Sequence, residues 1–243
     1  MNVLRASGER NGVRPAAVAS SMAGRVLSIL LLAAPLLGAR EQKAAERPAS
    51  PLPAEVASAF GRAASLYTDG AAHAAPFVQT YTPAGFTTAR RESGTLWIQT
   101  PQRLRFDYDA PERKVFTYDA GEGRLFTPED KQLTIQKLTP EERARLPIVF
   151  LSDPVELARE YAVSAEAAEA GATRVLLKPR APRPELAWLR LSVDRDGRVS
   201  ELSYEDAGGN RTEFRFEGWR KEKARPAADY RITGPPGTRI LQN

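Results

Sequence analysis

The chain has 243 residues, of which 42% are hydrophobic and 27% charged, as expected for a folded globular protein. Much of its formal charge of +5 lies in the first 39 residues, and the remainder has a net charge of +2. No basic stripe is interleaved with aromatic residues, so nucleic-acid binding is not expected. The chain has no cysteine and a single histidine, His73, which excludes disulfides, thiolate chemistry and a zinc site. We expect His73 to lie in a solvated loop. For the protein as a whole we expect no catalytic residue, metal or cofactor.

The N-terminal region has the layout of a secretory signal peptide. Met22–Ala39 combines a positive flank, an apolar run and small residues at its end. The apolar run, 26–37, is shorter than the roughly 20 residues that span a bilayer, although a buried or membrane-anchoring helix is the alternative. We expect translation to start at Met22, with residues 1–39 as extension and signal peptide and 40–53 as a proline-rich linker. The mature protein is then soluble and periplasmic.

One helix and a long series of strands follow in chain order. Val56, Phe60, Ala63 and Tyr67 recur at helical spacing and predict an amphipathic helix over 55–67. Alternation of apolar and polar residues, typical of half-buried strands, then continues almost to the end. The expected strands are 76–81, 91–100, 103–109, 114–119, 124–127, 131–138, 173–179, 186–194, 198–206 and 211–219, with a last piece before Pro235. Residues 139–160 interrupt them as a helical insertion that Thr139 can cap.

The spacing of these strands indicates an antiparallel sheet or barrel. Asp194–Gly197 forms a hairpin turn, in which Gly197 supplies the positive φ. No alternation of strands and helices appears, so a doubly wound parallel sheet is not expected. We predict a mainly β, α+β fold: an open, unclosed antiparallel barrel of about ten to eleven strands with a helical lid. Two short helices would not fill so large an apolar interior, so a ligand cavity is expected.

A group of motifs resembles the periplasmic outer-membrane lipoprotein carrier family, LolA. The residues that carry the resemblance are Phe77-Val78-Gln79, Gly94-Thr95-Leu96-Trp97-Ile98, Pro101, Arg105-Phe106-Asp107-Tyr108 and Pro111, then Leu189–Val193, Asp196-Gly197 and Pro235-Pro236-Gly237. With the N-terminal helix included, the resemblance covers about residues 54–240, and we predict a single carrier domain over 54–243. The resemblance implies an unclosed β-barrel whose helical lid covers an apolar concave face.

The resemblance also implies a function. Members take acylated lipoproteins from an inner-membrane lipoprotein-releasing ABC transporter and deliver them to an outer-membrane lipoprotein receptor, and we expect a monomer with no enzymatic activity. The expected acyl-chain cavity is lined by Leu96, Ile98, Leu104, Phe106, Tyr108, Phe126, Leu189, Leu191 and Val193. In the family, an arginine before the first proline latches the lid. Here Thr100 holds that position, and Arg103 and Arg105, which alternation places on the opposite face, are the other latch candidates.

Other functions fit parts of the sequence. Asp107 and Asp109 could form a carboxylate pair of an enzyme, but a solvated strand face beside arginines is favoured. A periplasmic domain that binds lipid or glycolipid, or senses lipoproteins, could share the fold, because fold does not decide function. We favour the carrier over the sensor because a sensor usually has a second domain. The outer-membrane receptor of the same pathway is another alternative, but it is normally lipid-anchored through a cysteine, and this sequence has none.

Overall fold

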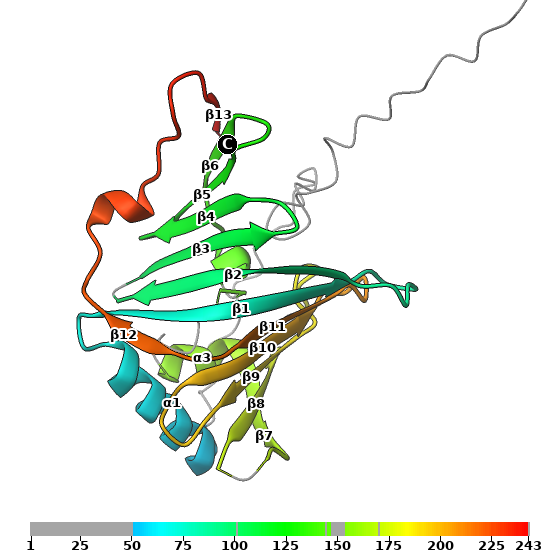
Figure 1. Ribbon diagram of the computed structural model, residues 1–243. Coiled ribbons are helices and arrows are strands. Elements are labelled where there is room, and N and C mark those ends of the chain that lie inside the picture. Colours follow the sequence, from blue (N-terminus) through cyan, green and yellow to red (C-terminus); the bar gives the residue numbers. More distant parts are fainter. Residues whose placement is uncertain (1–50, 101, 144, 147–153, 170, 243) are drawn as a thin grey trace, which may run out of the picture. The chain divides into compact units, whose positions relative to one another are not determined.

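The computed structural model describes residues 51–242 except positions 101, 144, 147–153 and 170 (Figure 1). The expected signal peptide and most of the expected linker lie outside the described residues. The described residues belong to one compact unit, Lys43–Asn243. Among them, no helix is long and apolar enough to cross a membrane.

Thirteen strands of the described chain form one sheet (Figure 1). Their bounds are β1 Ala72–Thr82, β2 Arg90–Gln99, β3 Arg103–Ala110, β4 Lys114–Asp119, β5 Glu122–Thr127, β6 Gln132–Lys137, β7 Tyr161–Glu166, β8 Thr173–Pro179, β9 Trp188–Val193, β10 Val199–Glu205, β11 Arg211–Phe216, β12 Arg220–Glu222 and β13 Arg239–Gln242. The order is β13-β6-β5-β4-β3-β2-β1-β11-β10-β9-β8-β7, and β12 also pairs with β1. Every pair is antiparallel except β13 with β6. The sheet ends at β13 and β7, which confirms the predicted unclosed, mainly β fold.

The described helices are few and short. They are α1 Ala54–Tyr67, α2 Pro140–Arg143, α3 Pro154–Glu160 and the 3-10 turn η3 Ala227–Tyr230. In α1, the apolar residues at helical spacing are the buried ones, as predicted. Before α2, Thr139 and Glu142 form a reciprocal capping box, in which each backbone N–H donates to the other side chain. The predicted cap at Thr139 is therefore confirmed.

Some local expectations differ from the structure. The sheet gains β7, β12 and β13, which the sequence pattern did not predict. The piece expected before Pro235 is not a strand, and only its first residues, Asp229 and Tyr230, belong to a regular element, the 3-10 turn η3. His73 is not in a solvated loop: it lies in β1, is 3% exposed, and its ring contacts the ring of Tyr67. Its Nε2 lies 3.0 Å from an oxygen of Asp69, and this partner allows a polar ring to be buried.

The sheet has two faces that the strand register defines. We call the face that carries Leu96, Phe106 and Leu191 the inner face, and the opposite one the outer face. The segment before β13 follows the outer face of β2 to β5, and β13 then adds to the sheet edge beside β6. Arg105 donates to the carbonyl oxygen of Asp229 at 2.7 Å, and Arg124 to that of Ile232 at 2.9 Å. This C-terminal segment therefore covers the outer side and leaves the inner side to other elements.

Candidate functional site

Eight of the nine residues expected to line a cavity share the inner face. In the β2–β3 pair, Leu96 lies opposite Phe106 and Ile98 opposite Leu104. The register then passes through β1, β11 and β10 to the inner residues of β9. All eight are 5% exposed or less: Leu96, Ile98, Leu104, Phe106, Tyr108, Leu189, Leu191 and Val193. These eight residues thus form an apolar surface that is closed to solvent in this structure.

Phe126 does not belong to this face. It pairs with Val115, one residue away from the inner residue Phe116, so alternation places it on the outer face. There its cross-strand neighbour is Leu133. Because Leu125 and Phe126 are adjacent and both apolar, their sequence alone does not fix which of them points inward. The expectation that Phe126 lines the cavity is therefore wrong.

An aromatic cluster crosses the middle of the inner face. Phe77 contacts Phe106 and Tyr108 with ring centroids 5.2 and 5.0 Å apart, although β2 separates their strands. Phe106 also contacts Phe214 of β11 at 5.6 Å. The intervening residue of β2 is Gly94, which lies between Phe77 and Tyr108 in the register and has no side chain to keep them apart. Phe214 and Phe216 were not among the residues expected to line the cavity.

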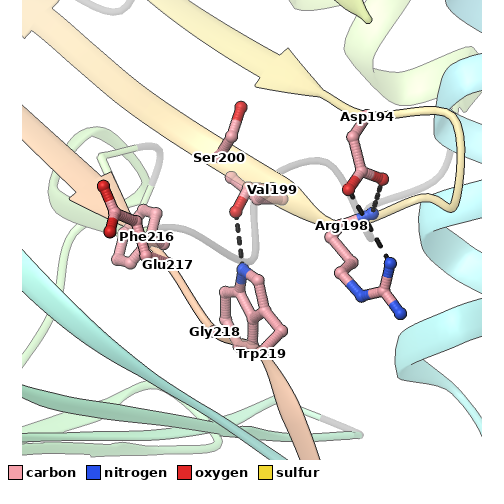
Figure 2. Close-up of a pocket in the computed structure, with 8 residues that line it drawn as sticks. All are labelled: Asp194, Arg198, Val199, Ser200, Phe216, Glu217, Gly218 and Trp219. Atoms are coloured by element: carbon pink, nitrogen blue, oxygen red, sulfur yellow. Dashed lines mark hydrogen bonds and ion pairs between the residues drawn. The ribbon is translucent and has the colours of Figure 1, made fainter. Parts of the chain in front are cut away.

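A pocket of about 310 Å³ opens where β10 and β11 diverge. Figure 2 shows Trp219 reaching across this gap, where its indole N–H donates to the carbonyl oxygen of Val199 at 2.6 Å. The inner residue Phe216 lines the pocket and contacts Trp219. Arg198 and Asp194 form its polar side (Figure 2). The volume lies at the lower end of the range for small-molecule sites, and the pocket adjoins the aromatic cluster through Phe216.

Helix α1 is fixed beside this pocket by its C-terminal residue. The hydroxyl of Thr100 donates to the carbonyl oxygen of Tyr67 at 2.9 Å, and the phenol of Tyr67 accepts from the backbone N–H of Val199 at 3.2 Å. Burial raises the pKa of Tyr67 well above its usual value, so the phenol stays neutral. Further along, the backbone of Arg62 lies so close to Gly197 that a Cβ there would be 2.6 Å from its carbonyl oxygen. Thr100 therefore bonds to helix backbone, although the sequence has no arginine at this position.

The other two latch candidates, Arg103 and Arg105, act on the outer face, as alternation predicted. Arg103 pairs with Asp119 at 3.0 Å, and Arg105 holds the C-terminal segment. Burial alone would raise the pKa of Asp119, but hydrogen bonds from Arg103 and Arg231 outweigh it and hold this pKa below its usual value. These arginines therefore fasten the C-terminal segment to the outer face.

Three polar residues of the inner face were not identified from the sequence as site residues. Gln79 and Lys114 are 1% and 3% exposed, and Glu92 lies opposite Gln79 in the register. Each occupies the strand parity of the inner residues. Gln79 lies two positions from Phe77, Glu92 two from Gly94, and Lys114 two from Phe116. A polar residue at an otherwise apolar parity is the sequence signal that could have indicated them. Among the described residues, no group of three or more His, Cys, Asp or Glu side chains could hold a metal ion.

These features define a class of protein: a mainly antiparallel open sheet with a buried, largely apolar inner face and a helix, α1, that is hydrogen-bonded to the sheet through Tyr67. Residues 71–233 match the family model of the outer membrane lipoprotein carrier protein LolA. The chain belongs to this family.

Named relatives agree with this assignment. The chain is 30% identical over 179 residues to an outer-membrane lipoprotein carrier protein of Xanthomonas axonopodis pv. citri, which covers 68% of this chain and 79% of that protein. A protein of the same description from Pseudomonas syringae pv. tomato is 26% identical, covering 69% of this chain and 80% of that one.

Among solved structures, an uncharacterized conserved protein of Thermus thermophilus matches with a TM-score of 0.49 and 10% identity, covering 78% of this chain and 99% of that one. A LolA superfamily protein of Nitrosomonas europaea matches with a TM-score of 0.41 and 10% identity, covering 72% and 96%. Both scores are below 0.5, so neither structure supports a statement about function.

Proposed function

We propose that this protein is a periplasmic carrier that binds the acyl chains of lipoproteins on its inner face and moves them from the inner to the outer membrane. The single observation that carries the proposal is the buried, largely apolar inner face, in a chain that belongs to the lipoprotein carrier family. The proposed role is binding and transfer, without catalysis. In this role the chain works as a monomer between a lipoprotein-releasing ABC transporter and an outer-membrane receptor.

The physical need for such a carrier follows from the ligand. An acyl chain gains about 0.8 kcal/mol for each methylene removed from water, so one long chain costs on the order of 10 kcal/mol to leave exposed. Apolar contacts are not directional, so the inner residues can bind chains of different composition. Release is possible because apolar binding depends on the area covered, and this area changes when a covering element moves.

Loading requires the inner face to open, because its residues are already buried. We propose that α1, together with the short helices α2 and α3, forms the lid that moves. The α1 C-terminus is attached through hydrogen bonds at Thr100 and Val199, and each contributes only about 1 kcal/mol. Acyl chains that enter from the pocket beside Trp219 would meet the aromatic cluster through Phe216.

The decisive experiment compares two phenylalanines on opposite faces of adjacent strands. A photo-reactive benzoylphenylalanine replaces either Phe116, on the inner face of β4, or Phe126, on the outer face of β5. Each variant is expressed in the periplasm, irradiated, and purified without detergent for native mass spectrometry and lipid extraction. We expect the Phe116 variant to crosslink to acylated lipoproteins and the Phe126 variant to remain free of them. Equal thermal melting of the two variants is the control for folding.

The outcomes distinguish the proposed carrier from its alternatives. Lipoprotein bound equally at both positions, or at Phe126 alone, would contradict binding on the inner face. Free phospholipid or glycolipid at Phe116 would instead favour lipid transport by the same surface. No adduct at either position would favour a sensing domain, and detection of export and processing at the N-terminus would test the periplasmic location separately.

A further inference from the structure

A polar group lies inside the apolar inner face. It consists of Gln79 on β1, Glu92 on β2, Tyr108 on β3 and Lys114 on β4, and we call it the inner polar group. The register places Gln79 opposite Glu92, and Tyr108 opposite Lys114. Gln79 also lies opposite the inner residue Phe214 of β11. Four strands thus contribute polar side chains to one place on the inner face, next to the aromatic side chains of Phe77 and Phe214.

The contacts within this group fix its members. The Tyr108 phenol donates to Oε1 of Gln79 at 2.8 Å, and Lys114 Nζ donates to Glu92 Oε1 at 2.6 Å. The same ammonium lies 4.4 Å from the centre of the Tyr108 ring, within the range of a cation–π contact. Burial, and to a smaller extent the charge of Glu92, raises the pKa of Tyr108 well above its usual value. The phenol therefore remains a neutral donor and holds the Gln79 amide in one orientation.

One strong donor of the group has no partner. Nε2 of Gln79 is buried, and no hydrogen-bond acceptor among the described residues meets it. An unpaired buried donor costs about 1–3 kcal/mol, and buried side-chain polar atoms are rarely left without a partner. An acceptor supplied by a ligand would remove this cost. The Gln79 amide is thus prepared to bind an oxygen atom that arrives with an apolar molecule.

The charges of the group indicate which kind of oxygen it accepts. Lys114 and Glu92 form a pair with no net charge, so the group offers no excess positive charge to a phosphate or carboxylate. An anion would also lie near the Glu92 carboxylate and be repelled by it. A carbonyl oxygen accepts a hydrogen bond without bringing a charge, and every acyl chain of a lipid begins at an ester or amide carbonyl.

We propose that the Gln79 amide binds the ester or amide carbonyl oxygen at which an acyl chain joins its headgroup. This inference rests on the proposed function and adds to it a defined polar end for each bound chain. The carbonyl at Gln79 fixes the depth to which the chain enters, while the methylenes beyond it cover the aromatic cluster around Phe77 and Phe106. The site would select acyl lipids from hydrocarbons of equal length.

The test compares two short-chain probes that differ only in the carbonyl groups: dihexanoylglycerol, a diester, and dihexylglycerol, the corresponding diether. Each probe displaces the apolar dye N-phenylnaphthylamine from the full chain in detergent-free buffer. Burying a carbonyl without a partner is unfavourable, so only a specific donor makes the diester bind more tightly than the diether. We expect a preference of about tenfold for the diester, the effect of one well-placed hydrogen bond to a buried donor.

Two variants assign this preference to Gln79. Gln79→Met removes the donor while keeping the length of the side chain, and we expect it to reduce the preference to about twofold or less. Gln136→Met makes the same change at a buried glutamine of β6, five strands away in the sheet order, and should keep the full preference. If the Gln79 variant does not fold, the comparison of the two probes on the unmodified chain still decides the question.

The failure of this inference differs from the failure of the proposed function. Equal displacement by both probes on the unmodified chain would overturn the carbonyl site while leaving apolar binding on the inner face intact. A diester preference that survives in Gln79→Met would also overturn it, because the donor would then lie elsewhere. If neither probe displaces the dye, binding of acyl chains by the inner face fails, and the carbonyl site fails with it.

Discussion

Replacing Gly94 by alanine tests whether the close approach of β2 and β3 supports the inner face. A Cβ at this position would lie 1.9 Å from the carbonyl oxygen of Asp107 and 2.9 Å from Cα of Tyr108. The obstacle is backbone, which has no alternative rotamer, and the register between the strands already shifts at Ser93 and Gly94. Since comfortable non-bonded contacts of carbon atoms lie at about 3.5–4.0 Å, the strands must separate locally by more than about 1 Å.

The cost follows from two contributions. Inserting a methyl group into a well-packed interior destabilises a protein by about 1–3 kcal/mol. Separating the strands also weakens at least one backbone hydrogen bond, which contributes about 1 kcal/mol. We therefore expect Gly94→Ala to lose about 3 kcal/mol, and for a domain of this size that lowers Tm by roughly 6–12 °C.

The assay is a thermal melt of Gly94→Ala beside Gly61→Ala. At Gly61, within α1, a Cβ meets no other atom within 4 Å, so alanine should stabilise the helix by about 0.5–1 kcal/mol. The two variants thus make the same chemical change with opposite expected signs. A Tm of Gly94→Ala within about 2 °C of the unmodified chain would refute the reasoning, because the strands would then tolerate a side chain at their closest approach.

Three further predictions concern the fastening of the chain and its response to acid. Thr100→Val removes the donor to Tyr67; it should cost about 1 kcal/mol in a urea melt and accelerate amide exchange in α1, and unchanged exchange would refute the latch. Trp219→Phe removes the bond to Val199 and should cost a similar amount, whereas equal stability would show that this bond adds nothing. The lowered pKa of Asp119 means that its ionised form contributes stability above about pH 4, which is lost as the pH falls further. Asp119→Asn should therefore flatten the acid limb of the stability profile below pH 4, and an unchanged limb would count against the pairing.

The strands whose two faces differ in polarity could be predicted from the sequence. In β3, Leu104, Phe106 and Tyr108 alternate with charged residues, and the structure buries these three. The alternation also placed Arg103 and Arg105 on the opposite face, where they contact Asp119 and the C-terminal segment. Wherever one face of a strand is apolar and the other charged, burial determines which face points inward.

Other parts of the fold depend on contacts that local sequence does not record. The strand β12 has only three residues, Arg220–Glu222, all charged, and pairs with β1 over a long sequence separation. The strand β13 is parallel to β6, so no hairpin turn in the sequence indicates their pairing. In β5, the adjacent Leu125 and Phe126 obscure the alternation, and only pairing with β4 resolves it.

The inner polar group shows why the candidate site was harder to predict than the fold. Alternation assigns a polar residue to the solvated face by default. Gln79 and Lys114 break this rule, because each shares the buried face of its strand with a phenylalanine two positions away, Phe77 or Phe116. The partners that make their burial tolerable, Tyr108 and Glu92, lie on other strands, so the compensation is visible only after the register is known. A local rule broken inside an otherwise consistent apolar face is expected where a protein needs specificity as well as stability. Under the proposed function, a purely apolar inner face would bury acyl chains equally well but could not distinguish the end of the chain that carries the headgroup.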